Sequence, residues 1–171
     1  MSETTLDQVL TQRHEAQKDI VNVDEPVVKL VVFELGDQRF AFQGERIREI
    51  LAQADVFFLP GCPPSLEGVI NVRGDIESVI RPHEMLHLPD SSVVGRASSI
   101  LLGVGGGMRS GIRVDRVIDV VDVPQSSIQP PPATLPEYLR ALVLGVLRLQ
   151  EHAVTVLDLD KMLADYARGL G

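Results

Sequence analysis

The chain has 171 residues, 44% of them hydrophobic and only 4% aromatic, so Val, Ile and Leu must build the core of one domain or of two small ones. Its formal net charge of −8 argues against a nucleic-acid partner, because nucleic acids bind basic surfaces. A single Cys excludes an internal disulfide, the N-terminus does not resemble a signal peptide, and no apolar run reaches the roughly 20 residues that span a bilayer, so we expect a cytoplasmic protein without direct membrane insertion.

Residues 1–25 differ in composition from the rest of the chain. They hold six acidic and two basic residues, and so carry half of the net charge of −8. Leu6, Val9 and Leu10 follow helical spacing, but they form only a thin apolar stripe. We interpret this segment as an acidic N-terminal arm that contributes little to the core, since charged termini are often poorly ordered. The alternative is a helix that docks on a partner or on its own domain, which occupies residues 26–171.

Short apolar runs rich in β-branched residues alternate with turn residues and predict ten strands. They are expected at 27–35, 39–43, 54–59, 69–72, 76–80, 97–104, 109–114, 117–123, 142–150 and 153–158. Residues 45–51 instead place Ile47, Ile50 and Leu51 on one face of one or two helical turns, and residues 160–167 predict a closing helix. Short, evenly spaced strands favour small β-barrels over βαβ units, in two similar halves before and after residue 90.

The stretch from Leu66 to Ile80 carries the clearest turn signal in the chain. Arg73, Gly74 and Asp75 separate two apolar runs. This pattern predicts a tight hairpin, because Gly accepts a positive φ and Asp bonds to its own backbone. Asn71, Arg73 and Asp75 then lie at or near the tip of the hairpin. The sequence therefore predicts a rigid β-scaffold that presents an arginine.

The segment His83-Glu84-Met85-Leu86-His87 fits the H-E-x-x-H pattern of zinc proteases. That pattern needs both imidazoles on one face of a long helix, together with a third ligand. Pro82 and Pro89 confine the predicted helix to about one and a half turns, and nothing in the sequence places His152 beside it. We therefore interpret the match as chance and keep a small zinc hydrolase as a distant alternative.

Two further features resemble catalytic or binding motifs and are given structural interpretations. Residues 103–107 are rich in glycine and follow a predicted strand, but they lack the Lys-Ser/Thr ending of a phosphate loop and a strand follows them, so we expect a hairpin turn. Cys62 has no activating base near it in the sequence, and we expect it to be inert. The sequence thus predicts no catalytic residue, metal or cofactor.

Several short segments occur along the chain in a characteristic order and spacing. They are 30–36, 47–50, 64–74, 111–117, 138–139, 145–146 and 156–163. Together they resemble the CheW-like domain family of chemotaxis coupling proteins over roughly residues 27–167. The resemblance implies a mostly β fold of two five-stranded SH3-like barrels packed around a shared core, with short connector helices and a C-terminal helix. The barrel halves are expected at about 26–90 and 91–171, with the chain free to cross between them.

The resemblance also implies a non-enzymatic adaptor. Such domains connect the cytoplasmic tips of methyl-accepting chemoreceptors, in membrane-attached arrays, to the regulatory domain of a histidine kinase. The matching positions imply a partner-binding set, which consists of Glu49, Asn71, Arg73, Gly74 and Asp75. The alternative for Arg73 is a guanidinium that bonds to loop carbonyls of its own domain. The alternative function is a related scaffold of a non-chemotactic receptor–kinase system, such as surface motility.

The chain departs from the family pattern at one place. The family usually continues beyond the hairpin with a proline and an Asp-Leu pair, where this chain has Ser78 and then Arg81-Pro82. Since Pro has no amide donor, we expect different local bonding there. Ten apolar residues of the predicted strands are expected to form the core. They are Val31, Phe33, Val69, Ile70, Val79, Ile100, Ile112, Val114, Val146 and Leu157.

Overall fold

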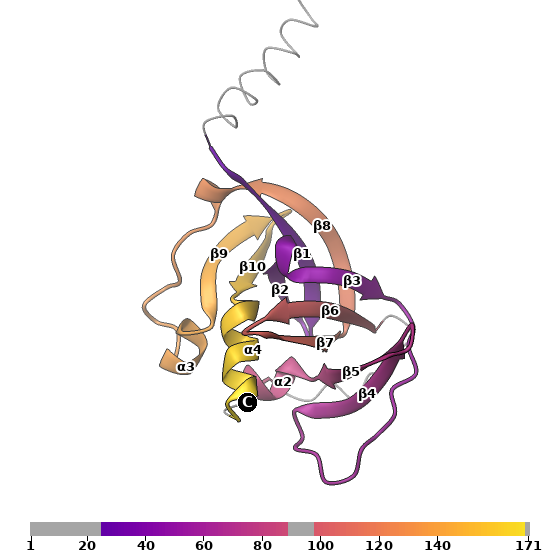
Figure 1. Cartoon of the computed structure of the whole chain (residues 1–171). Coiled ribbons are helices and arrows are strands. Elements are labelled where there is room, and N and C mark those ends of the chain that lie inside the picture. Colours follow the sequence, from indigo (N-terminus) through magenta and orange to yellow (C-terminus); the bar gives the residue numbers. More distant parts are fainter. Residues whose placement is uncertain (1–24, 89–97, 170–171) are drawn as a thin grey trace, which may run out of the picture.

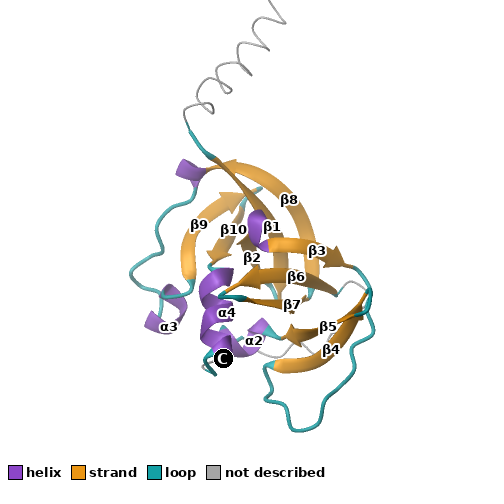
Figure 2. Cartoon of the chain, in the orientation of Figure 1, coloured by secondary structure: helices purple, strands orange, loops and turns teal. Residues whose placement is uncertain are grey.

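Two five-stranded sheets make up most of the computed structural model, which describes residues 25–88 and 98–169 (Figures 1 and 2). Sheet A has the strand order β8-β1-β2-β10-β9, formed by β1 (Val27–Leu35), β2 (Gln38–Gln43), β8 (Arg116–Pro124), β9 (Val143–Leu149) and β10 (His152–Leu157). Sheet B has the order β3-β6-β7-β5-β4, formed by β3 (Ile47–Leu51), β4 (Leu66–Val72), β5 (Asp75–Ile80), β6 (Ser99–Gly105) and β7 (Met108–Val114).

The two sheets share one pairing pattern. Along each strand order the first two pairings are antiparallel, the third is parallel and the last is antiparallel. The elements before residue 90 and those after it form two similar series, but residue 90 does not separate the sheets. Sheet A takes β1 and β2 from the first series and β8 to β10 from the second, because β3 and β8 each cross over to pair with a hairpin of the other series.

Short helices connect the strands. The described residues contain the 3-10 turns η1 (Gly44–Arg46) and η2 (Gln125–Ser127) and the helices α2 (Pro82–Met85), α3 (Glu137–Arg140) and α4 (Leu159–Ala167). The side chain of Asp158 caps α4 by accepting a hydrogen bond of 3.1 Å from the amide of Lys161. At the start of α2, Arg81 provides no such cap and Pro82 occupies the first turn. None of these described helices has the length and apolar character needed to cross a membrane.

Three apolar clusters fill the fold. The largest lies between the sheets and α4, and includes Phe33 and Phe42 of sheet A and Leu101 and Ile112 of sheet B. The alternate residues of sheet A, such as Leu30, form a second cluster, and Ile70, Val79 and Ile100 of sheet B form a third. This arrangement follows from strand geometry, because successive side chains of a strand point to opposite faces.

Helix α4 joins the C-terminal end of sheet A to the β6–β7 turn of sheet B. A Cβ on Gly105 would lie 2.7 Å from Cα of Asp160, and one on Gly106 would lie 2.5 Å from the amide nitrogen of Ala164. The amide of Gly106 donates a 2.8 Å hydrogen bond to Oδ1 of Asp160. The glycines of this turn therefore allow a close helix–turn contact, and the segment is the hairpin turn predicted from the sequence.

Most predicted strands are confirmed, and two segments are corrected. In residues 45–51 only the start is a 3-10 turn, and Ile47–Leu51 forms strand β3. A register shift against β6 between Ile47 and Glu49 explains the irregular apolar spacing that had suggested a helix, and Ile50 is exposed. The predicted strand at 54–59 is a loop in which Phe57 alone forms a bridge, to Val69.

Eight of the ten predicted core residues are buried, whereas Val69 and Val146 are only partly buried. The reason is topological, since both residues lie on strands at the border of their sheets and pair there with loop residues. The predicted acidic arm lies outside the described residues, except for Glu25. The carboxylate of Glu25 accepts a hydrogen bond of 2.9 Å from the amide of Ser126.

Candidate functional site

A two-residue turn connects β4 to β5 and forms the predicted hairpin tip. Val72 pairs with Asp75, and the intervening Arg73 and Gly74 have φ angles of 51° and 94°. Positive φ at both positions is the geometry whose twist matches that of the flanking strands. Oδ1 of Asn71 accepts a 2.8 Å hydrogen bond from the amide of Gly74. Asn71 and Gly74 therefore shape the turn, while Arg73 and Asp75 carry its charges.

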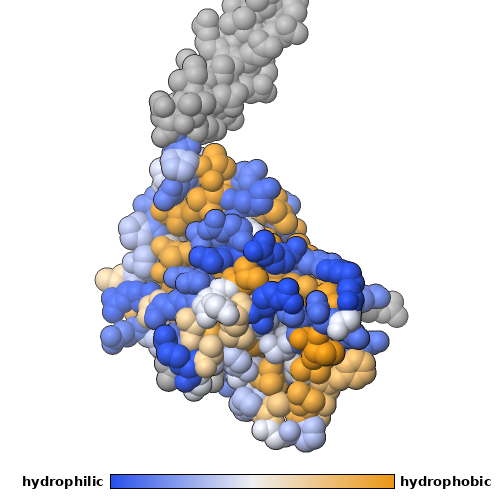
Figure 3. Space-filling view, in the orientation of Figure 1, coloured by the Kyte–Doolittle hydropathy of each residue, from blue (hydrophilic) through white to orange (hydrophobic). Residues whose placement is uncertain are grey.

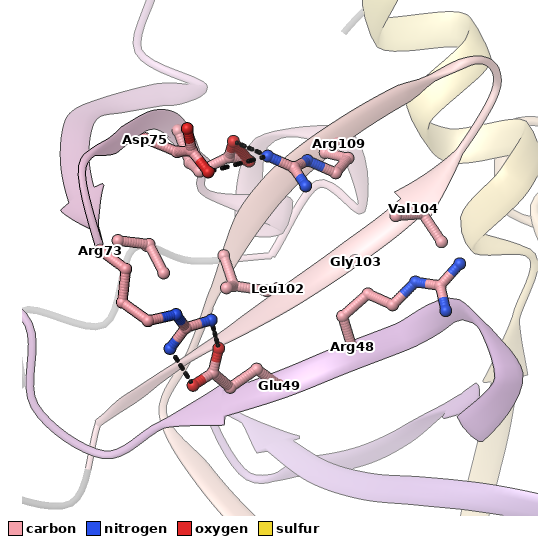
Figure 4. Close-up of a pocket in the computed structure, with 10 residues that line it drawn as sticks. Arg48, Glu49, Arg73, Asp75, Leu102, Gly103, Val104 and Arg109 are labelled. Atoms are coloured by element: carbon pink, nitrogen blue, oxygen red, sulfur yellow. Dashed lines mark hydrogen bonds and ion pairs between the residues drawn. The ribbon is translucent and has the colours of Figure 1, made fainter.

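The guanidinium of Arg73 binds the carboxylate of Glu49 through two parallel hydrogen bonds (Figure 4). Nη1 donates to Oε1 at 2.9 Å and Nη2 donates to Oε2 at 2.7 Å. Glu49 lies on β3 at one end of the strand order and Arg73 follows β4 at the other end, so the ion pair links the two borders of sheet B. The Arg73 side chain remains 73% exposed and the Glu49 side chain 31% exposed. Among residues 25–88 and 98–169, Arg73 thus bonds to a carboxylate of its own chain and not to loop carbonyls.

This ion pair changes the protonation of both partners. The hydrogen bonds from Arg73, followed by its positive charge, lower the pKa of Glu49 against the opposing effect of desolvation. The same hydrogen bonds, followed by the negative charge of Glu49, raise the pKa of Arg73. Both groups are therefore ionised at neutral pH.

Further charges surround the ion pair. Arg48, Glu77 and Arg109 line the same hollow of about 150 Å³ as Glu49 and Arg73. Figure 4 shows the Arg48 guanidinium directed away from the Glu49–Arg73 pair, and the Arg109 guanidinium directed toward Asp75. Nη2 of Arg109 lies 2.7 Å from Oε1 of Glu77 and 3.9 Å from Oδ2 of Asp75. The structure therefore brings Glu49, Arg73 and Asp75 of the predicted set into one charged cluster.

Sequence reasoning missed Glu77 and Arg109. Glu77 is buried and pairs in register with Ile70, so it stands at an inward position of β5. An acid at an inward position of an alternating strand is a usable signal, because a buried carboxylate needs a partner. Its partner Arg109 is 32 residues away along the chain, and only the parallel β5–β7 pairing brings the two strands together.

The H-E-x-x-H segment does not form a metal site. Helix α2 ends at Met85, so His87 is outside it with a φ of 53°, and its ring stacks on Tyr138 at a centroid distance of 4.0 Å. His83 is buried with Nε2 3.5 Å from Oδ1 of Asp115. Since zinc ligands on a helix must share one face, the segment cannot chelate a metal through both imidazoles. Within residues 25–88 and 98–169, no cluster of His, Cys, Asp or Glu has a metal-binding arrangement.

Comparison with known proteins identifies the family. The sequence profile of the CheW-like domain matches residues 29–167, which include α4 and both sheets apart from the first two residues of β1. The chain belongs to the CheW-like domain family. It is 27% identical over 146 residues to the chemotaxis protein CheW of Treponema pallidum, covering 83% of this chain and 85% of that protein. It is also 27% identical over 143 residues to protein FrzA of Myxococcus xanthus, covering 81% of this chain and 86% of that protein.

A solved CheW structure has the same fold. The scaffolding protein TtCheW from Thermoanaerobacter tengcongensis superposes with a TM-score of 0.68 and is 25% identical in sequence. The superposition covers 76% of this chain and 83% of TtCheW. The predicted fold class is confirmed in that the structure is mostly β, with two five-stranded sheets and a C-terminal helix, and the family resemblance found in the sequence is confirmed as well.

Proposed function

We propose that this chain is a non-enzymatic adaptor that couples chemoreceptors to a histidine kinase, and that the hairpin tip around Arg73 is one of its partner contacts. Family membership over residues 29–167 supports the adaptor function, together with relatives that are named chemotaxis protein CheW. Its partners would be the kinase's regulatory domain and the cytoplasmic tip of a receptor, which places the chain in the cytoplasm at membrane-attached receptor arrays. Neither nucleic acid nor direct membrane insertion is part of this function.

The observation that carries the site is the exposed guanidinium of Arg73, which is held in one orientation by Glu49. A guanidinium has five N–H donors, and Glu49 accepts from two of its nitrogens, so donors remain for a partner. Because Glu49 already fixes the long side chain, binding costs less conformational entropy than it would for a free arginine. Asp75 adds an exposed acceptor beside it, while Asn71 and Gly74 hold the turn in place.

The direct test is titration calorimetry of the chain with the kinase's regulatory domain and, separately, with a receptor-tip fragment. Arg73→Glu should weaken binding at least about tenfold, as expected for a residue near the centre of a contact. Arg73→Lys should have an intermediate effect, since it keeps the charge but loses the two-pronged geometry. The matched control is Gln150→Glu, a charge change in the equivalent β9–β10 turn of sheet A. Unchanged affinity of Arg73→Glu for both fragments would remove Arg73 from the interface.

A swapped pair separates a partner contact from a purely structural role. The double variant Glu49→Arg/Arg73→Glu restores an ion pair between β3 and the hairpin but reverses its direction. If the pair only supports the fold, the double variant should recover normal binding. If the Arg73 guanidinium contacts the partner, as we propose, binding should stay weak while the melting temperature recovers relative to Arg73→Glu.

A related scaffold of a non-chemotactic receptor–kinase system is the second candidate. The similarity to FrzA, a family member whose name does not refer to chemotaxis, favours it. Co-purification of the chain with each receptor and histidine kinase of its own cell distinguishes the two candidates, because each predicts a different set of bound receptors.

A further inference from the structure

A hollow of about 450 Å³ lies between the helices that follow the two border hairpins. Its walls come from α2 and α4, from the segment around α3 and from the end of the β3–β4 loop. Within the described chain, it shares no lining residue with the charged hollow around Glu49 and Arg73. Figure 3 shows hydrophilic and hydrophobic residues side by side over α4 and its surroundings. Small-molecule sites are hollows of about 300–1,000 Å³ and often lie where two structural units meet.

Ser65 and Leu142 occupy equivalent positions in the two halves of the fold, and both line the hollow. Each directly precedes the first strand of a border hairpin, and the two hairpins have the same register shift at that end. The carbonyl of Ser65 accepts a 2.7 Å hydrogen bond from the amide of Arg81, as that of Leu142 accepts one of 2.8 Å from the amide of Asp158. The fold therefore accommodates leucine at this position in one half and has serine in the other.

The serine contributes both space and an unsatisfied hydroxyl. Leu142 packs into the largest apolar cluster, whereas the shorter side chain of Ser65 fills less of the volume beside it. Ser65 is 2% exposed, and its Oγ has no hydrogen-bond partner in the described chain. A buried hydroxyl without a partner is costly, and rotation about its χ1 bond can turn it toward an occupant of the hollow. Ser65 thus provides a polar group in a largely apolar place.

The lining combines an aromatic wall with apolar side chains. The rings of His87 and Tyr138, which stack on each other, both line the hollow and are exposed to solvent. Pro63, Met85 and Leu142 add apolar surface. Linings of this kind bind an apolar or aromatic body, and the face of a tyrosine ring also attracts cations.

The charged groups of the lining leave one carboxylate available. The lining includes Glu84, Lys161 and Asp165. Asp165 forms ion pairs with Lys161, at 3.7 Å, and with Arg168, so both of these cations are already engaged. Glu84 is exposed and forms no ion pair within residues 25–88 and 98–169. The available carboxylate favours a positively charged ligand, and the net charge of −8 favours its approach.

We infer that this hollow binds a small organic cation, namely a primary amine carried on an aromatic or apolar body. The body lies against the Tyr138–His87 pair, and the ammonium group donates to the carboxylate of Glu84 and to the hydroxyl of Ser65. An ammonium group has three N–H donors, so it can bond to both. Because α2 and α4 both line the hollow, an occupant that contacts the two helices stabilises the folded chain. The inference does not depend on the proposed adaptor function.

The test is titration of the full chain with phenethylamine, followed by the NMR signals of the Tyr138 and His87 rings and by the melting temperature. We expect a dissociation constant on the order of 1 mM, as is usual for a ligand of this size, and a rise in melting temperature near saturation. Phenylpropionate, which carries a carboxylate on a similar body, should bind at least about tenfold more weakly, because it lacks the ammonium group.

Variants of two lining residues locate the site. Ser65→Leu should fill the hollow, as Leu142 does from the other half, and weaken binding at least about tenfold without lowering the melting temperature. Glu84→Gln should weaken binding about tenfold through loss of a charged hydrogen bond. The matched controls are Ser126→Leu and Glu137→Gln, which change exposed residues outside the lining and should leave binding unchanged. If Ser65→Leu does not fold, the comparison of Glu84→Gln with Glu137→Gln decides.

Each contrary outcome has a distinct meaning. A wild-type chain that shows no binding at about ten times the expected dissociation constant would overturn the inference, and so would equal binding of phenylpropionate. Binding that Glu84→Gln and a folded Ser65→Leu both retain would place the amine elsewhere. Displacement of phenethylamine by the kinase's regulatory domain or by the receptor tip would assign the hollow to a side chain of that partner and not to a free molecule. None of these results tests the adaptor function, which the Arg73 variants address separately.

Discussion

The β4–β5 and β9–β10 hairpins occupy equivalent places in the two sheets but differ in chemistry. Both end their strand order, both turn through two residues of positive φ, and each is preceded by a loop bridge. The β4–β5 turn is Arg73-Gly74 and is linked to β3 by an ion pair, whereas the β9–β10 turn is Gln150-Glu151. At equivalent inward positions, β5 has Glu77 and β10 has the fully buried Val154. The two hairpins therefore share one backbone geometry, and the charged residues distinguish the β4–β5 hairpin of sheet B from the β9–β10 hairpin of sheet A.

The helices that follow these hairpins show a second contrast. Asp158 caps α4, which extends over nine residues and packs its apolar face into the shared core. Helix α2 extends over four residues and has no side-chain cap, because Arg81-Pro82 occupies the equivalent positions. The expectation that local bonding at Arg81-Pro82 differs from the family pattern stays a prediction, since this contrast lies within one chain. The longer helix α4, which joins the two sheets, therefore follows the β9–β10 hairpin, whereas the short helix α2 follows the β4–β5 hairpin.

The largest effects should come from equivalent core truncations in the two sheets. Ile70→Ala in sheet B and Leu147→Ala in sheet A each remove a buried side chain and should lower the free energy of unfolding by about 2–4 kcal/mol. Urea denaturation followed by circular dichroism measures both. Because the largest cluster is shared, we expect a single transition in each variant. Separate transitions for the two sheets would contradict the shared core.

Glycine substitutions at the two loop bridges should have smaller, matched effects on stability. Gly68→Ala and Gly145→Ala each force a Cβ against a loop carbonyl and should cost about 1–3 kcal/mol through displacement of the loop. Thermal melts should show similar losses. A loss of stability in one variant but not in the other would contradict the equivalence of the two loop bridges.

Removal of the side-chain cap of α4 should lower the stability of the chain by a smaller amount. Asp158→Ala leaves the amide of Lys161 without its acceptor and should destabilise the chain by about 1 kcal/mol. Asp158→Asn retains an acceptor and serves as the control, with a smaller expected loss. Chemical denaturation measures the difference. A cost for Asp158→Ala equal to that of Asp158→Asn would show that the hydrogen bond contributes nothing.

The smallest effect concerns the pH dependence of the Glu49–Arg73 pair. Since the pKa of Glu49 is lowered in the folded chain, mainly by hydrogen bonds from Arg73, its contribution to stability is present above the ordinary pKa and is lost as the pH falls through the lowered one. The difference in melting temperature between wild type and Arg73→Gln should therefore shrink in acid. NMR titration of the Glu49 carboxyl should show its pKa return toward the ordinary value in Arg73→Gln. An unchanged titration would mean that the pair is not formed in solution.

The sequence by itself determined the local structure. Alternating apolar residues located most strands, Arg73-Gly74 located the hairpin turn, and residues 160–167 were predicted as the closing helix, which the structure has as α4. The strands and the turn depend on neighbours along the chain, which supply side-chain alternation and positive φ. The order and spacing of the motifs were also sufficient to identify the family.

Only the tertiary structure decided which distant groups meet. A bulge in β3 turned an apparently helical pattern into a strand, and the crossing of β3 and β8 combined strands from both halves of the chain in each sheet. The pairing of Arg73 with Glu49, 24 residues apart, and the exposure of Phe57 depend on how sheet B brings its borders together. These contacts depend on backbone pairing between remote strands, and a pattern read along the chain gives the type of each residue but not its partner.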